Sequence, residues 1–232
     1  MKENLYVEVT ADKVYKKKLV KRIASIALCI LLLLLTITYA IVYIVNVGGN
    51  FTITLDPNVK DERNIVASNR EDFAVTGIKF QAVALPYMTN ISEAWIDKDV
   101  DEIDGPHNGD NYIAYTFYLK NAGTQIVDYY ADINILSVIK NVDEAVRVAV
   151  YKDGEKEVYA KKSSYSKNPE PGTIPFDSNT KVMIKHVKNF NPGDIDKYTV
   201  VIWLEGDDPE CIDNILGGEI KIEMVIREIH ND

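Results

Sequence analysis

The chain has 232 residues, of which 26 are basic and 35 acidic, so its formal net charge at pH 7 is −9. The first 22 residues hold seven basic and three acidic residues, which leaves 19 basic and 32 acidic residues, a charge of −13, for the rest. A surface this acidic argues against nucleic acid or an anionic membrane surface as the partner of that larger part.

Residues 23–47 form one apolar run without a charged residue, and it directly follows a basic cluster of Lys13, Lys16, Lys17, Lys18, Lys21 and Arg22. As a helix rising about 1.5 Å per residue, the apolar run is about 37 Å long, enough to cross a hydrocarbon core of about 30 Å. Basic residues are enriched on the cytoplasmic flank of such helices. The sequence therefore predicts a cytoplasmic tail over 1–22, a transmembrane helix over Ile23–Val47 and an extracellular remainder.

The same apolar run allows a second interpretation, a cleavable signal peptide. Ala40 and Thr38 offer a small residue and a tolerated one at the two positions that signal peptidases inspect. The apolar core of a signal peptide is usually about 7 to 15 residues long, however, whereas this run continues to Val47. Its length favours an uncut anchor, and cleavage after Ala40 stays as the alternative.

The chain has two cysteines, Cys29 inside the apolar run and Cys211 outside it. No disulfide can therefore form within the extracellular part, which must be stabilised by its hydrophobic core. Cys211 is predicted to be a free thiol. It is either buried and inert or available for cross-linking.

After the apolar run, short apolar segments alternate with polar residues and are separated by Gly, Pro, Asn and Asp, a pattern typical of β-strands. Tyr112–Lys120 and Gly218–Glu228 each have one apolar face, and the second is expected to be antiparallel and half exposed. Both faces of Tyr198–Leu204 are apolar, which predicts a central, covered strand. Asp153 and Gly154 lie between two alternating segments and predict a hairpin with a type I′ turn.

Further strands are expected at Phe51–Leu55, Phe73–Leu85, Gln125–Ile139, Ala145–Tyr151, Lys156–Lys162 and Lys181–Val187, with a helical turn at Asn141–Ala145. About nine strands without an internal repeat predict an all-β fold, a single antiparallel β-sandwich. We place this domain at 71–232 and a juxtamembrane segment at 48–70. Within that segment, Asp56–Asn69 fits a short helix or a loop.

The densest polar segment lies at residues 95–110, and it holds four aspartates, Asp97, Asp99, Asp101 and Asp104. Carboxylates at alternate positions resemble the start of a Ca²⁺ loop, which makes these four residues the candidate Ca²⁺ ligands. A run of charged residues is more often a solvated loop, however, and this is the preferred interpretation. An EF-hand is excluded, because Glu102 and Asn108 occupy the positions that need Gly and Glu.

A second acidic segment, Glu205–Cys211, follows the predicted central strand. Loops at the ends of sandwich strands commonly carry binding sites. Gly206 and Pro209, however, also fit a simple turn that ends the strand. Both interpretations stay open.

The three histidines, His107, His186 and His230, are scattered along the chain. The sequence contains no His-Glu-x-x-His zinc motif, no nucleophile elbow and no Gly-rich phosphate loop. It therefore predicts no catalytic residue and no cofactor, with Ca²⁺ as the one candidate ion. A surface hydrolase that uses metal bound by the acidic loops is the remaining enzymatic alternative.

Four segments resemble exported proteins of Gram-positive bacteria in the TasA and camelysin group, namely Asn111–Thr124, Val127–Ala131, Arg147–Lys152 and Tyr198–Cys211. The resemblance covers about residues 110–228. It is most specific in the Leu-Lys-Asn-Ala-Gly and Trp-Leu-Glu-Gly portions. It implies a jelly-roll sandwich at the cell surface or in the biofilm matrix.

Members of that group polymerise by lending an N-terminal strand to the next subunit. The resemblance implies a homo-oligomer with a donor strand formed here by Phe51, Thr52, Ile53, Thr54 and Leu55. The apolar run departs from the group because it is too long for a simple cleavable signal. No zinc motif matches the protease activity ascribed to camelysin. We therefore expect a membrane-anchored, non-catalytic protein that works by contact with a protein or matrix component. The alternative is a released fibre subunit cut after Ala40.

Overall fold

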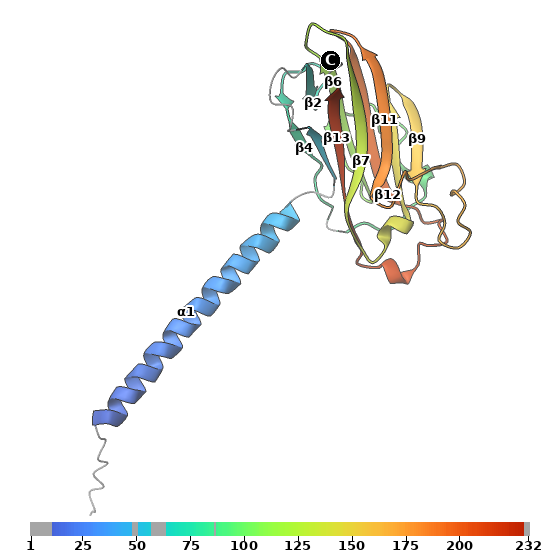
Figure 1. Cartoon of the computed structure of the whole chain (residues 1–232). Helices are drawn as coiled ribbons and strands as arrows, with labels where there is room; N and C mark the ends of the chain where they lie inside the picture. The colour runs from blue at the N-terminus through green and yellow to red at the C-terminus, as the bar shows by residue number, and fades with distance from the viewer. Residues whose placement is uncertain (1–10, 48–50, 57–63, 86, 230–232) are drawn as a thin grey trace, which may run out of the picture. The chain divides into compact units, whose positions relative to one another are not determined.

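The computed structural model describes residues 11–47, 51–56, 64–85 and 87–229. The chain divides into two compact units, Met1–Gly48 and Gly49–Asp232 (Figure 1). The described part of the first unit is helix α1, and the second unit contains all the strands. The segment 48–70, expected to be separate from the domain, therefore contributes strands to the second unit.

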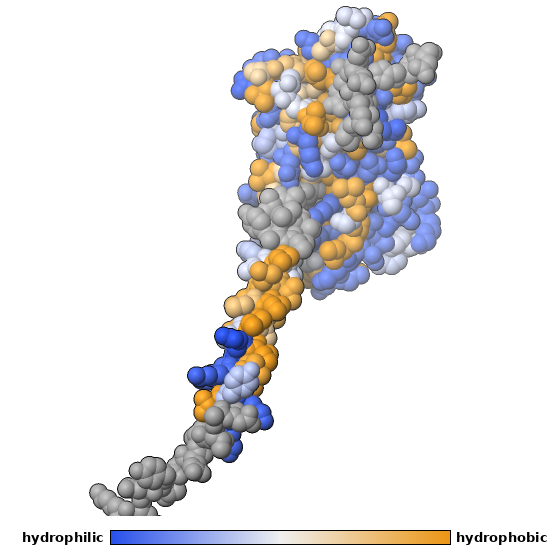
Figure 2. Space-filling model, turned by 60° about the vertical axis from the view of Figure 1, so that its left-hand side comes forward, coloured by the Kyte–Doolittle hydropathy of each residue, from blue (hydrophilic) through white to orange (hydrophobic). Residues whose placement is uncertain are grey.

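Helix α1 (Ala11–Val47) begins twelve residues before the apolar run, inside the expected tail. Lys, Arg, Leu and Ala have high helix propensity, and neither Gly nor Pro interrupts this stretch, so the helix continues through the basic cluster. Within the described residues, one segment, Lys13–Tyr39, is long and apolar enough to cross a membrane. Its apolar side chains follow one another along the helix surface (Figure 2).

In the described residues, the second unit has thirteen strands and three short 3-10 helices. The longer strands are β1 (Phe51–Leu55), β6 (Tyr112–Asn121), β7 (Val127–Ile139), β8 (Val146–Lys152), β9 (Glu155–Ala160), β11 (Lys181–Phe190), β12 (Ile195–Leu204) and β13 (Glu219–Ile229). The shorter strands are β2 (Ile65–Ser68), β3 (Thr76–Gly77), β4 (Lys79–Gln81), β5 (Gly105–Pro106) and β10 (Ile174–Pro175). The 3-10 helices are η1 (Glu93–Trp95), η2 (Val142–Glu144) and η3 (Asp213–Ile215).

The strands form two sheets. The smaller has the order β11-β7-β13-β1-β4, and the larger has the order β10-β9-β8-β12-β6-β2-β3, with β5 paired to β6. Most neighbours are antiparallel, but β1 runs parallel to β13 and β10 runs parallel to β9. The expectation of purely antiparallel sheets is wrong for these two pairs. In neither pair does a tight hairpin join the strands, so no local turn imposes the antiparallel direction.

Buried apolar side chains of both sheets form one hydrophobic cluster. Phe51, Ile133 and Met224 enter it from the smaller sheet, and Phe117 and Val200 enter it from the larger. Each of these five side chains is 0% exposed. Burying one side chain of this kind contributes about 1.5 to 3 kcal/mol, so this shared core is the main source of stability for the second unit.

Local sequence patterns gave several correct predictions. The segments expected at Tyr112–Lys120 and Tyr198–Leu204 are strands β6 and β12, and β12 lies between β8 and β6 as a central strand should. The β8–β9 hairpin turns at Asp153 and Gly154, whose φ angles are +52° and +86°. Both angles are positive, as a type I′ turn requires. The predicted helical turn is η2.

The prediction of a single strand at Phe73–Leu85 is wrong. Only β3 and β4 form there, and they belong to different sheets, because β3 pairs with β2 whereas β4 pairs with β1. The chain changes sheets at Ile78, and Phe73 has a φ of +52°, which is incompatible with a strand. Within the undecided segment Asp56–Asn69, β2 is a strand, and residues 57–63 lie outside the described part.

Candidate functional site

Strand β1 is an interior strand of the smaller sheet. It pairs in parallel with β13 on one side and antiparallel with β4 on the other. Its inward side chains, Phe51, Ile53 and Leu55, are buried, and Thr52 and Thr54 are half-buried. The predicted donor strand is thus a core strand of its own domain in this structure.

The four aspartates that are candidate Ca²⁺ ligands are not brought together as a metal site. Asp97 and Asp104 accept hydrogen bonds from the hydroxyls of Tyr112 at 2.7 Å and Tyr118 at 2.6 Å, and the other two aspartates are exposed or half-buried. Burial and the hydrogen bond to Asp97 raise the pKa of Tyr112 to about 12. In the described part of the chain, none of these aspartates belongs to a group of three carboxylate, His or Cys ligand atoms within 4.8 Å.

Residues 91–100, which include Asp97 and Asp99, cover part of the outer face of the larger sheet. Ile91 and Val100 form a second hydrophobic cluster with Ala149, Val201 and Trp203, which lie on the face of the sheet opposite the shared core. This cover explains why both faces of β12 are apolar. The hydrogen bonds from two tyrosines of β6 hold the acidic segment to the same sheet.

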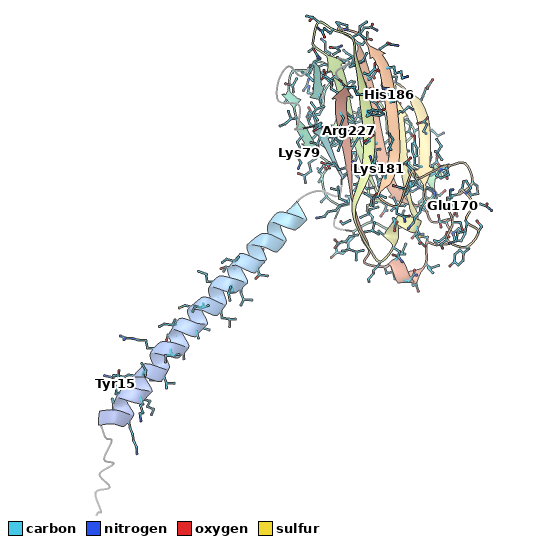
Figure 3. All side chains as sticks on the ribbon, viewed as in Figure 1. Tyr15, Lys79, Glu170, Lys181, His186 and Arg227 are labelled. Atoms are coloured by element: carbon cyan, nitrogen blue, oxygen red, sulfur yellow. The ribbon has the colours of Figure 1, made fainter. Side chains whose placement is uncertain are left out.

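A different carboxylate cluster forms where the loop after β9 meets the loop after β12. Glu170 comes from the first loop, and Asp208 and Glu210 come from the second. One carboxylate oxygen from each residue lies within 4.8 Å of the others, and none of the three residues is more than 8% exposed. Glu170 lies among the loops at one end of the strands (Figure 3). We call these three residues the carboxylate cluster.

Arg147 of β8 contacts the carboxylate cluster from the sheet. Its Nη2 atom lies 2.5 Å from Asp208 Oδ2 and 3.9 Å from Glu170 Oε2. Three ionised carboxylates and one guanidinium carry a net charge of −2. Excess charge in a buried site is unfavourable unless it is paired.

Hydrogen bonds from the loop after β9 position Glu210. Its Oε1 atom accepts a bond from the backbone N–H of Ser164 at 2.7 Å and from the hydroxyls of Ser163 and Ser164 at 3.0 Å each. Its own N–H donates to Asp208 Oδ1 at 2.8 Å. Glu210 Oε2 and Glu170 Oε1 are buried and have no hydrogen-bond partner in the described structure.

The two carboxyl groups of Asp208 and Glu210 differ strongly in acidity. Burial is the main cause that raises the pKa of Asp208 to about 6; the hydrogen bond with Glu210 raises it further, and Arg147 opposes the increase. Burial also acts to raise the pKa of Glu210, but hydrogen bonds from Asp208, Ser164 and Ser163 outweigh it and bring this pKa to about 2. Such a separation is typical of neighbouring carboxylates that cannot both ionise freely.

Cys211 follows the carboxylate cluster and is a free thiol in the structure. Its half-buried side chain packs against the shared core. Burial, followed by the nearby carboxylates of Asp208 and Glu205, raises its pKa. Because the thiolate is the reactive form, these surroundings favour the inert interpretation of this cysteine.

The outer face of the smaller sheet carries another buried carboxylate, that of Asp132, but its charge is compensated. Asp132 Oδ2 accepts hydrogen bonds from Lys181 at 3.2 Å and from Arg227 at 2.7 Å. The Arg227 guanidinium lies 5.0 Å from the ring centroid of Tyr130, which stacks on His186 at 4.5 Å. Figure 3 labels three of these residues, Lys181, His186 and Arg227. Two cations face one carboxylate here, the opposite of the charge balance in the carboxylate cluster.

Sequence interpretation missed Glu170 and Arg147. Arg147 stands between Val146 and Val148 in an alternating strand, where a basic residue ordinarily faces solvent, so the pattern does not indicate a buried acidic partner. Glu170 lies in a polar loop whose pattern gives no such indication either. Its proximity to Asp208 depends on tertiary structure alone.

No protein-family model matches the chain, and no curated protein matches it. Among solved structures, the chain is similar to a β-glucosidase from Kluyveromyces marxianus in complex with glucose, with 12% identity and a TM-score of 0.25. The similarity covers 72% of this chain and 16% of that chain. It is too low to support an argument about fold or activity.

Proposed function

We propose that this chain is a single-pass membrane protein whose β domain, a jelly-roll-like sandwich, lies outside the cell and works by contact with a protein or matrix component. The observation that carries this proposal is the exposure of α1. The side chains from Leu31 to Leu35 are 53–60% exposed, although leucine normally avoids water. A helix that is apolar all round needs a cover, and a bilayer provides one.

The basic cluster supports an orientation with the N-terminus in the cytoplasm. It directly precedes the apolar run, and basic residues near the end of a span favour the cytoplasmic side. The β domain then lies on the opposite side. Its two sheets share one core, which supports the sandwich, and the resemblance to the TasA and camelysin group supports the jelly-roll order.

Protease treatment of intact cells tests this arrangement. A chain with one epitope tag at each end is expressed, and a protease that cannot cross the membrane is added. The expected result is loss of the C-terminal tag, while the N-terminal tag stays protected in the membrane pellet. Protection of the C-terminal tag would reverse the orientation, and recovery of the C-terminal tag in the medium before protease is added would contradict the anchor.

A released fibre subunit is a second candidate, and the position of β1 favours it. Strand β1 begins at Phe51, beyond the possible cleavage point after Ala40, so a cut chain would keep this strand. The strand fills an interior place in the smaller sheet. The same place in a neighbouring subunit would accept an exchanged strand with the same side chains.

A cysteine pair distinguishes the two candidates. Thr52 and Glu223 are partners in the parallel register of β1 and β13. With both replaced by Cys in a background without Cys29 and Cys211, oxidation of the anchored protein is expected to give a cross-linked monomer. A ladder of covalent multimers would instead favour strand exchange between subunits.

A further inference from the structure

Two oxygens of the carboxylate cluster are buried without a partner. Glu170 is 8% exposed and Glu210 is 4% exposed, and Glu170 Oε1 and Glu210 Oε2 accept no hydrogen bond from the described residues. Buried polar atoms in native proteins almost always have a partner. A ligand bound at this position would give both oxygens a partner.

The spacing of the cluster suits a single metal ion. One oxygen from each of Glu170, Asp208 and Glu210 lies within 4.8 Å of the other two. Two oxygens on opposite sides of a Ca²⁺ ion are about 4.8 Å apart, because each Ca–O distance is about 2.4 Å. The three oxygens therefore lie within the span of one coordination sphere.

The charge of the site also points to a divalent cation. With all groups ionised, the three carboxylates and Arg147 carry a net charge of −2, which one divalent ion neutralises. A hollow of about 300 Å³ adjoins the cluster and is lined in part by Glu93, Glu205 and Asp207. These further acidic side chains favour the approach of a cation over that of an anion.

We propose that Glu170, Asp208 and Glu210 bind one Ca²⁺ ion. The donors are all carboxylate oxygens, which hard cations prefer, and they come from two irregular loops, which suits the flexible coordination of Ca²⁺ better than the strict octahedron of Mg²⁺. Arg147 donates a hydrogen bond to Asp208 Oδ2 and thereby orients that carboxylate. The bound ion joins the loop after β9 to the loop after β12. It thereby stabilises the end of the larger sheet.

Thermal unfolding of the intact chain in detergent micelles tests this site. The protein is first stripped with a chelator and then melted with and without 10 mM CaCl₂. For a dissociation constant on the order of 10⁻⁴ M, we expect the unfolding midpoint to rise by about 5 to 10 °C. Isothermal titration calorimetry of the same sample with CaCl₂ is expected to show one site per chain.

Three variants locate the site. Glu170→Gln and Glu210→Gln are expected to lose the calcium-dependent shift. Asp99→Asn removes the same charge from the exposed acidic segment and is expected to keep it. Without calcium, Glu170→Gln should be at least as stable as the parent, because it relieves repulsion inside the cluster. This result separates loss of binding from loss of folding.

Four results would contradict the binding of Ca²⁺ by Glu170, Asp208 and Glu210. An unchanged midpoint of the parent at 10 mM CaCl₂ would overturn it, and so would a full shift in both Glu170→Gln and Glu210→Gln. Loss of the calcium-dependent shift in Asp99→Asn would place the Ca²⁺ site in the acidic segment at residues 95–110 and contradict this assignment. An equal shift with MgCl₂ would contradict the choice of Ca²⁺.

Discussion

Phe51 of β1 pairs with Ile222 of β13 in parallel register, and their side chains are 0% and 1% exposed. The pair joins β1, the strand that follows α1 in sequence, to β13, the last strand of the described residues. Because β1 lies between β13 and β4, its removal would leave backbone groups of both neighbours unpaired. The strand implied as a donor by family resemblance is therefore also a structural requirement of this domain.

Truncation of Ile53 tests the contribution of β1 to the core. Its side chain is 0% exposed, so Ile53→Ala is expected to lower the free energy of unfolding by about 2 to 4 kcal/mol. Thr52→Ala, in the same strand but on the outward face, is expected to change it by about 0.5 kcal/mol or less. Denaturant unfolding measures both, and equal effects would show that β1 is not packed as described.

Tyr129 and Asp196 form a buried hydrogen bond in which the phenol donates, and the Tyr129 hydroxyl also lies 2.9 Å from that of Tyr198. Burial is the main cause that raises the pKa of Tyr129. The folded protein therefore keeps this proton at a pH where the unfolded chain has lost it. Stability should be unaffected by this group below about pH 10 and should fall as the pH rises further.

Tyr129→Phe is expected to lower the free energy of unfolding at pH 7 by about 1 to 3 kcal/mol, because Asp196 loses a buried donor. The same substitution should also make the decline in unfolding free energy above pH 10 shallower. Denaturant unfolding between pH 7 and pH 11 measures both effects. Tyr165→Phe, at a side chain that is 69% exposed, serves as the control and should leave both nearly unchanged. A parent-like alkaline slope in Tyr129→Phe would contradict the account.

Arg147 compensates buried charge, so its loss should be costly. Arg147→Met leaves Asp208 and Glu170 without their cation, and we expect the free energy of unfolding to fall by about 3 to 5 kcal/mol in the absence of added metal. Arg70→Met removes an ion pair with Asp72 whose side chains are more than half exposed, and it should cost about 1 kcal/mol or less. Similar losses of unfolding free energy in the two variants would show that the buried Arg147–Asp208 pair contributes no more to stability than the exposed Arg70–Asp72 pair.

A charge in the middle of α1 should impair membrane insertion. Leu33→Arg is expected to oppose insertion by about 2.5 to 3.5 kcal/mol and to lower the fraction of the chain in the membrane pellet. Leu136→Arg is the matched control, since Leu33 is 60% exposed and Leu136, in the β domain, is 58% exposed. Quantitative blotting of pellet and supernatant compares them, and equal pelleting of the two variants would count against a membrane role for the helix.

Features that depend on neighbouring residues were predictable from the sequence. The alternation in β6 and β12 and the Asp153-Gly154 turn are local, because strand period and positive φ act within a few residues. The helix over the apolar run was likewise predictable from the residues of the run itself. Its helix extends further than the run because Lys and Arg of the basic cluster also favour helix.

Features that depend on distant contacts were not predictable. Parallel pairing joins Phe51 to Ile222, and a change of sheet occurs at Ile78, where local alternation suggested one continuous strand. The acidic segment looked like a metal loop, but Asp97 accepts a hydrogen bond from Tyr112. The carboxylate cluster could not be predicted from the sequence, because Glu170 and Asp208 come close together only in the folded domain.

The mass of the intact protein recovered from cell membranes tests the central claim most directly. We expect a chain that still contains residues 23–47, because the apolar run remains in the bilayer as an anchor. A mature chain that begins at Ile41 would contradict the account and identify a released subunit.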